Sequence, residues 1–169
     1  QTFNDTSTMG SALAHDHIVL ARTWSGSIRW HPEDPKQCLI DFRVSVKGLD
    51  PDPPNLRAKY GLEGELSSNQ REDVKKNMLS ADQLDVQNHP NILFQAYSCD
   101  KSEGIVTVTG MLTIRDVERE VRFPMNVNLE DGFHAKGFFS VEHSDFGFKP
   151  YSALLGSFRN KPEIKFIFD

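Results

Sequence analysis

Alternation of apolar and polar residues with a period of two dominates this chain. From Cys38 to Lys47, one set of alternate residues is apolar and the intervening set is mostly polar. Successive side chains of a β-strand point to opposite faces, so this pattern predicts a half-buried strand. The alternation recurs in 106–114, 121–127, 135–141 and 164–168. The Asp131-Gly132 pair between two of these runs favours a tight hairpin, because both residues tolerate positive φ.

The middle third of the chain has a different pattern. The segment Gly48–Asn55 contains three prolines, which cannot donate to a strand ladder, so we expect a rigid loop there. A helix is predicted over about 67–79, where Ser67 and Gln70 have the spacing of a capping box. Val74 and Met78 give this helix a narrow apolar stripe.

Many strands, one helical excursion and a final strand at the end of the chain favour an all-β fold with one helix. We expect an antiparallel eight-stranded β-barrel in a single domain over residues 1–169. Closure removes exposed sheet edges, and a barrel of this size holds either packed side chains or one small ligand. A β-sandwich is the alternative that periodicity alone does not exclude.

The composition adds two constraints. The 169 residues include 12 Phe against 3 Tyr and 2 Trp, a bias that suits a thick core or an apolar pocket. The net charge of −5 argues against nucleic acid or an anionic membrane as a partner. No run approaches the roughly 18 apolar residues of a membrane span.

The two cysteines, Cys38 and Cys99, allow one disulfide without requiring it. The alternative is a pair of buried free thiols, which behave as small hydrophobic groups. The chain begins at Gln1 without methionine, which suits the mature form of an exported protein and equally a trimmed chain.

Four motifs carry a family resemblance, in this order along the chain: Asp73–Ser80, Gln83–Phe94, Gly110–Arg115 and Ser144–Phe148. With them the chain resembles the YceI-like family of lipocalin-like polyisoprenoid-binding proteins over nearly its whole length. The resemblance implies an elongated barrel with a helix packed at one end, an interior channel for an isoprenoid or similar amphiphile, and a periplasmic or secreted location. The chain departs from the family at Asp116, where glycine is frequent, and at Glu142-His143-Ser144, where a basic residue is common.

A ligand would lie against the inward-facing side chains of the predicted strands, with His17 near its polar head group. The predicted ligand-binding residues are Ile28, Trp30, Phe42, Phe94, Val108, Leu112, Phe123, Met125, Phe139, Phe166 and His17. The alternative is that the apolar members of this set fill a solid core. We expect a small apolar ligand as partner and no cofactor, apart from a bound isoprenoid or quinone-like lipid. A homodimer is left open.

Histidines offer the second functional hypothesis, a metal-binding small enzyme or redox protein. On a strand, His15 and His17 share a face and would bind one metal, with His134 or His143 as a distant third ligand. A hydrogen-bonded pair that orders the start of the barrel is the simpler interpretation. Catalysis has little support, because no Gly-x-Ser-x-Gly elbow accompanies Ser144. We therefore predict a binding protein and not an enzyme.

Overall fold

The computed structural model describes residues 1–7, 15–31 and 33–169. In these ranges, most strands form one nine-stranded antiparallel sheet, and β2 and β5 pair separately. The strands are β1 (Thr2–Asn4), β2 (Val19–Ala21), β3 (Trp24–Arg29), β4 (Leu39–Ser45), β5 (Leu49–Pro51), β6 (Asn91–Ser102), β7 (Ile105–Ile114), β8 (Val117–Asn128), β9 (His134–Glu142), β10 (Ser152–Ala153) and β11 (Phe158–Phe168). The helices are α1 (Leu56–Lys59) and α2 (Ser68–Leu79), with 3₁₀ turns at Pro35–Gln37, Val46–Gly48, His143–Phe146 and Leu154–Gly156.

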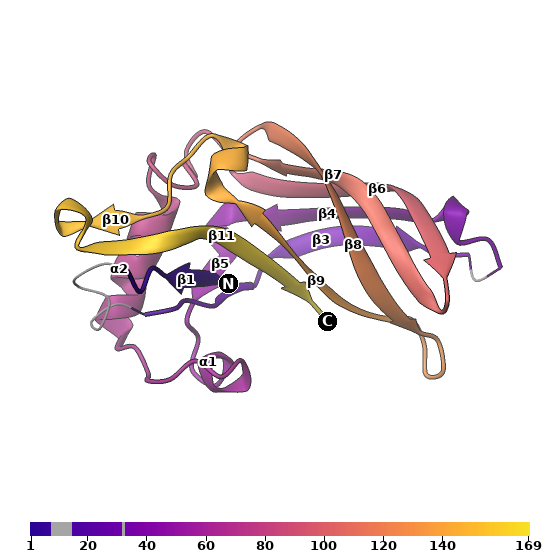
Figure 1. Cartoon of the computed structure of the whole chain (residues 1–169), viewed down its shortest axis with the longest axis horizontal. Coiled ribbons are helices and arrows are strands. Elements are labelled where there is room, and N and C mark those ends of the chain that lie inside the picture. Colours follow the sequence, from indigo (N-terminus) through magenta and orange to yellow (C-terminus); the bar gives the residue numbers. More distant parts are fainter. Residues whose placement is uncertain (8–14, 32) are drawn as a thin grey trace.

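The sheet is strongly curved but open. Its order is β1-β11-β9-β8-β7-β6-β4-β3, with β10 on β11, so β1 and β3 are its two edges. Figure 1 shows β8 and β9 crossing over β3 and β4, and α2 at the opposite end of the molecule from the β8–β9 loop. The prediction of an antiparallel β fold with a helix is confirmed. Among the described residues β1 and β3 do not pair, so the predicted closed barrel is not confirmed.

Two contacts link segments that are not neighbours in the strand order, one at each end of residues 17–30. At one end, Thr2 of β1 and His17 exchange two backbone hydrogen bonds of 2.9 Å each. At the other end, the ring of Trp30, just after β3, lies 6.0 Å from the ring of Phe133 in the β8–β9 loop. The first contact links the edge strand β1 to the segment that leads into β2, and the second links the end of the edge strand β3 to the β8–β9 loop.

Glycines covered by phenylalanine rings allow the strands to bend. A Cβ on Gly110 of β7 would lie 2.5 Å from the carbonyl oxygen of Gln95 and 2.8 Å from the ring of Phe94. A Cβ on Gly137 of β9 would likewise meet the ring of Phe168 at 2.5 Å. At both positions the backbone lies so close to an aromatic ring that no residue with a Cβ would fit. Glycines of this kind are one way in which a sheet becomes curved.

The tight hairpins lie elsewhere than predicted. Two-residue turns at Glu103-Gly104 and Arg115-Asp116 join β6 to β7 and β7 to β8. All four residues have positive φ, from 50 to 84°. This is the conformation that type I′ turns require. The prediction for Asp131-Gly132 was wrong, because β8 ends at Asn128 and β9 begins at His134, which leaves a longer loop.

The helix prediction is confirmed, and the loop prediction needs a correction. Ser67 caps α2, and its capping box with Gln70 is formed in both directions. The segment predicted as a rigid loop, Gly48–Asn55, instead contains the short strand β5, whose partner is β2. Proline is tolerated there because Pro51 is the last residue of a strand in a two-stranded sheet.

The predicted inward faces of the central strands form the core. In β7 every second residue is buried, from Val106 at 1% exposure to Ile114 at 2%. Val121, Phe123 and Met125 of β8 are buried against them. The alternation of the sequence therefore corresponds to the two faces of these strands.

Candidate ligand-binding site

Five phenylalanines form a continuous cluster on the concave face of the sheet. Phe123 of β8 lies at its centre, with ring centroids 5.7 Å from Phe94, 4.7 Å from Phe139 and 5.5 Å from Phe168. Phe139 in turn stacks on Phe166 at 5.0 Å. We call Phe94, Phe123, Phe139, Phe166 and Phe168 the phenylalanine cluster.

Strand register places these rings together. Phe139 of β9 is directly opposite Phe166 of β11, so the two side chains share a face. Phe94 of β6 is opposite Leu112 of β7 in the same way. Phe123 is only 5% exposed, whereas Phe94, Phe139, Phe166 and Phe168 are half-buried. The cluster therefore combines a closed floor with apolar ring surface that remains accessible.

The structure groups most of the predicted ligand-binding residues around this cluster. Val108, Leu112, Phe123 and Met125 are buried in the core that forms its floor. Trp30, Phe42, Phe94, Phe139 and Phe166 are half-buried and pack against that floor. Ile28 is opposite Ile40 and shares its face, but it is 39% exposed because β3 is an edge strand. Phe168 was missed, although it continues the alternation of Ile164 and Phe166.

Two hollows in the described surface lie away from the phenylalanine cluster. The larger, of about 420 Å³, is lined mainly by outward-facing residues of β3, β4 and β6, among them Arg29, Asp41 and Tyr97. The smaller, of about 190 Å³, lies beside Asp52 and Arg57. Neither of these two hollows is lined by the phenylalanine cluster.

His17 belongs to a buried ionic cluster and not to the phenylalanine face. Its Nδ1 lies 2.7 Å from Oδ2 of Asp52, whose other oxygen accepts a hydrogen bond of 2.7 Å from Arg57. The backbone N–H of Ile18 also donates to Asp52. Arg57 donates to the carbonyl oxygens of Asp16, Glu63 and Gly64. The cluster therefore ties the segment before β2 to the segment that follows β5.

The Asp52 carboxylate is charged in this setting. Burial by itself raises the pKa of Asp52, but the hydrogen bonds and positive charge of His17, the Ile18 N–H and Arg57 outweigh it and lower the pKa below its usual value of 3.8. The Asp52 side chain is fully buried and that of Arg57 is 5% exposed. Such a group is tolerated inside a protein only because its partners satisfy it.

The metal hypothesis gains no support from this geometry. Asp52 occupies Nδ1 of His17, and His15 is exposed. Within residues 1–7, 15–31 and 33–169, no three His, Cys, Asp or Glu side chains are grouped so as to hold a metal ion. Of the two candidate third ligands, His143 is buried, and its Nδ1 donates 2.6 Å to the carbonyl oxygen of Pro162. A structural zinc site usually needs four ligands, and the part of the chain that the structure describes does not bring them to His15 and His17.

Buried His143 predicts an acid-sensitive stability. Burial lowers the pKa of His143 below its usual 6.5, with the Pro162 hydrogen bond as a smaller opposing effect. Below pH 6.5 the His143 side chain binds a proton more readily in the unfolded chain than in the folded protein. The free energy of unfolding therefore declines as the pH falls from 6.5 through the lower pKa that His143 has in the folded protein. Urea unfolding at pH 7.5 and at pH 5 measures this loss, and His143→Asn is expected to reduce it. An equal loss in the variant would contradict the assignment.

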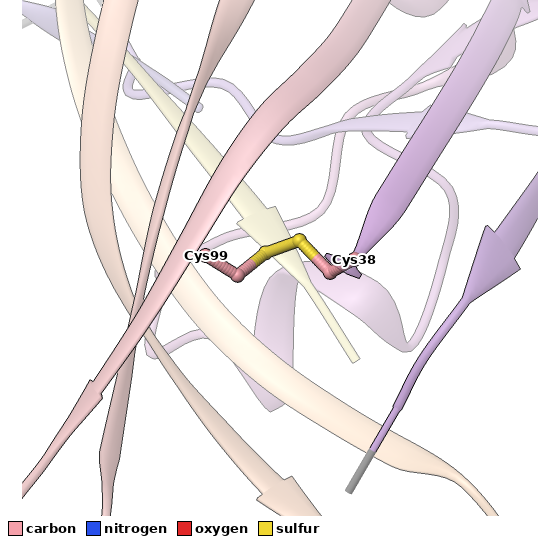
Figure 2. Close-up of a disulfide and its surroundings, with 2 residues drawn as sticks. All are labelled: Cys38 and Cys99. Atoms are coloured by element: carbon pink, nitrogen blue, oxygen red, sulfur yellow. A yellow bond between two sulfur atoms is a disulfide. The ribbon is translucent and has the colours of Figure 1, made fainter. Parts of the chain in front are cut away.

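Cys38 and Cys99 form a disulfide with a Cα–Cα distance of 5.9 Å (Figure 2). It joins the residue before β4 to β6, and both cysteines are at most 1% exposed. A shift in the β6–β7 register between Ala96 and Ser98 explains why they meet. Without this bulge, alternation from Phe94 and Ala96 would turn Ser98 inward and Cys99 outward. The bulge turns Cys99 to the face of Cys38.

Comparison with known proteins identifies the family. The YceI-like domain matches residues 6–168, which is nearly the whole sequence. The chain belongs to the YceI-like family. No curated protein matches it.

Solved structures share the fold. The structure of BcnA from Burkholderia cenocepacia has a TM-score of 0.62 and 14% identity, over 87% of this chain and 86% of that chain. The YCEI protein of Campylobacter jejuni has a TM-score of 0.60 and 14% identity, over 89% of this chain and 83% of that chain. In the described ranges, no helix has the length and apolar character that crossing a membrane requires.

The structure also explains one departure of this YceI-like chain from its family. Asp116, at the position where glycine is frequent, has φ of 58° in the turn between β7 and β8. Aspartate tolerates this conformation better than most residues do. Its carboxylate lies 2.9 Å from Nδ1 of His89, and Arg115 donates to the carbonyl oxygen of Gln83. The turn is thereby tied to the segment before β6.

The Ser144–Phe148 motif has a local structural role. His143–Phe146 form a 3₁₀ turn, and Gly147 ends it with φ of 75°. A Cβ on Gly147 would meet nothing within 4 Å, so no close approach of another backbone requires glycine there. The glycine is needed for its positive φ, and the turn buries Phe146 and Phe148 in the core.

Proposed function

We propose that this protein binds and carries an isoprenoid-like or other long apolar amphiphile on the concave face of its sheet. The observation that carries the proposal is the phenylalanine cluster, in which four half-buried rings surround buried Phe123. Membership of a family known for binding apolar ligands supports it. Burial of apolar surface contributes roughly 25 cal/mol per Å² without strict geometry, which suits a long flexible ligand.

A buried donor indicates where the polar end of the ligand would lie. Nε1 of Trp30 is inaccessible to water and has no hydrogen-bond partner among the described residues. Because a buried N–H without an acceptor costs free energy, a hydroxyl or carbonyl oxygen of the ligand would stabilise this position. We therefore place the head group near Trp30, at the end of β3. The sequence had placed it near His17 instead.

The bound form is expected to be a lipocalin-like barrel that encloses the ligand. The Thr2–His17 bridge links β1 to the segment before β2, and the Trp30–Phe133 contact links the end of β3 to the β8–β9 loop. A ligand between these points would cover the half-buried rings and the inward side of β3. We assign no catalytic residue and no cofactor other than the bound lipid, and we regard the protein as a carrier and not an enzyme.

A periplasmic or secreted location is part of the proposal. The Cys38–Cys99 disulfide supports it, because disulfides form and persist in oxidising compartments. The YceI-like family, whose members are typically periplasmic, supports it as well.

Titration of lipid-free protein with isoprenoids tests the function. Farnesol, geranylgeraniol and a C40 polyprenol are added in turn, and the fluorescence of Trp24 and Trp30, the chain's two tryptophans, reports binding. Native mass spectrometry gives the stoichiometry. We expect one ligand per chain and affinity that rises with length. Absence of a complex with all three alcohols would contradict the proposal.

Two adjacent residues of β9 provide a matched pair of variants. Phe139→Ala removes a ring of the phenylalanine cluster, whereas Phe138→Ala removes a ring that is 55% exposed on the opposite face. We expect Phe139→Ala to weaken polyprenol binding about tenfold, or about 1.4 kcal/mol, and Phe138→Ala to leave it unchanged. Equal affinities in the two variants would place the ligand elsewhere. Circular dichroism confirms that both variants are folded at the temperature of the titration.

A further inference from the structure

The edge strand β3 exposes its whole length. All six of its residues, Trp24 to Arg29, are exposed, and the two large apolar ones, Trp24 and Ile28, are 60% and 39% exposed. Trp24 is opposite Val44 and Ile28 is opposite the buried Ile40, so both side chains lie on the inward face of the sheet. Long exposed edges invite pairing with another strand unless charges or prolines block them, and neither interrupts the stretch from Trp24 to Ile28.

The direction of the backbone groups on this edge follows from one hydrogen bond. The N–H of Ser45 donates 2.9 Å to the carbonyl oxygen of Thr23, and Thr23 is aligned with Ser45 in the β3–β4 register. Antiparallel ladders alternate, so Ser25, Ser27 and Arg29 also direct their backbone groups toward β4. Trp24, Gly26 and Ile28 therefore direct their N–H and C=O groups away from the sheet.

The sequence of β3 is self-complementary about its centre. Trp-Ser-Gly-Ser-Ile reads as apolar, serine, glycine, serine, apolar in either direction from Gly26. We propose that β3 pairs with β3 of a second copy of this chain, antiparallel and with the two-fold axis at Gly26. Gly26 then faces Gly26 of the second copy, Trp24 faces its Ile28, and Ser25 faces its Ser27.

This register uses every outward-directed group of the edge. Gly26 and the two Trp24–Ile28 pairs occupy hydrogen-bonded positions, so the N–H and C=O groups of all three residues find partners. Each Trp24 gains an aliphatic neighbour on the inward face, a favourable cross-strand pair. On the outer face, only the small side chains of Ser25 and Ser27 lie at the junction between the copies. Within each copy, Ser25 is opposite Arg43 and Ser27 is opposite Asp41, so the paired serines lie between Arg43 of one copy and Asp41 of the other.

Cysteine cross-linking tests the register. Ser25 and Ser27 of the second copy would form a non-hydrogen-bonded pair, whose side chains lie close enough for a disulfide. Under mild oxidation we expect a mixture of the Ser25→Cys and Ser27→Cys proteins to form covalent dimers, and each variant alone to form few. The native cysteines do not compete, because both are in the Cys38–Cys99 disulfide. No cross-link in the mixture, or equal cross-linking by the single variants, would overturn the proposed register.

Sedimentation velocity of the unmodified chain tests the dimer itself. Wild-type protein is expected to dimerise as its concentration rises, and Ile28→Lys, which places a charge on the inward face of the edge, is expected to remain monomeric. Ile105→Lys is the control, since Ile105 is 49% exposed on β7 and away from the β3 edge. A monomeric wild type, or a dimer that Ile28→Lys leaves intact, would overturn the proposal. Circular dichroism establishes that both lysine variants are folded.

Discussion

Replacement of Arg57 by methionine is expected to lower the free energy of unfolding by about 3–5 kcal/mol. Arg57 is the partner of the fully buried Asp52 carboxylate, at 2.7 Å, and it donates to three backbone carbonyl oxygens as well. Methionine keeps much of the apolar volume but provides no donor. Asp52 would keep only His17 and the Ile18 N–H as partners, and the carbonyl groups would lose theirs.

A second arginine–aspartate pair provides the control for this prediction. Arg22 contacts Asp50 at 2.6 Å, but the Arg22 side chain is 57% exposed, and Arg71 contacts the same carboxylate. Arg22→Met is therefore expected to cost less than about 1 kcal/mol, as is usual for surface ion pairs. Urea unfolding followed by circular dichroism measures both variants. If Arg57→Met costs no more than Arg22→Met, the buried cluster does not stabilise the fold as proposed.

Asp52→Asn separates the charge of the cluster from its packing. In the Arg57→Met background, the neutral amide removes the unpaired negative charge, so we expect it to recover part of the lost stability. In the wild-type background the same change leaves Arg57 without its anion and is expected to destabilise the protein. Stabilities that add independently in the double variant would show that Asp52 and Arg57 do not interact.

The sequence predicted the features of this fold that depend on local pattern. The strands of β7 and β8 and the capping box of α2 follow from alternation and spacing, which are readable residue by residue. The ionic cluster of His17, Asp52 and Arg57 was missed, because its partners are up to 40 residues apart and polar residues in a proline-rich segment are ordinarily exposed. Only the folded arrangement shows that Asp52 is buried.

In the candidate site, too, the features that depend on local pattern were predicted and those that depend on the folded arrangement were not. Alternation correctly grouped Phe123 and Met125 with the buried face, but it carried no information on curvature or on where the sheet ends. The exposure of Ile28 depends on β3 being an edge strand. The buried Nε1 of Trp30, which has no hydrogen-bond partner among the described residues, depends on how the chain packs just after β3. The choice between a solid core and a ligand site therefore depends on long-range strand order, which a period of two does not encode.

Loss of the Cys38–Cys99 disulfide is expected to lower the free energy of unfolding by about 4 kcal/mol. The two cysteines are 61 residues apart in the sequence, and the entropy of closing a loop of that length in the unfolded chain gives this magnitude. The bridge also fixes the start of β4 to β6 beyond the bulge that separates Ala96 from Ser98. Without it, the end of β4 next to the exposed edge strand loses its covalent link to the centre of the sheet.

Single and double alanine variants distinguish the cross-link from side-chain packing. Cys38→Ala, Cys99→Ala and the double variant all lack the bridge, so urea unfolding is expected to show nearly the same loss in all three. If the loss came from packing, the two single losses would add in the double variant. Reductant provides an independent check, because it should lower the stability of the wild type and leave the double variant unchanged. A double variant within about 1 kcal/mol of the wild type would show that the bridge contributes little to this fold, since native disulfides of small secreted domains typically contribute 2–5 kcal/mol.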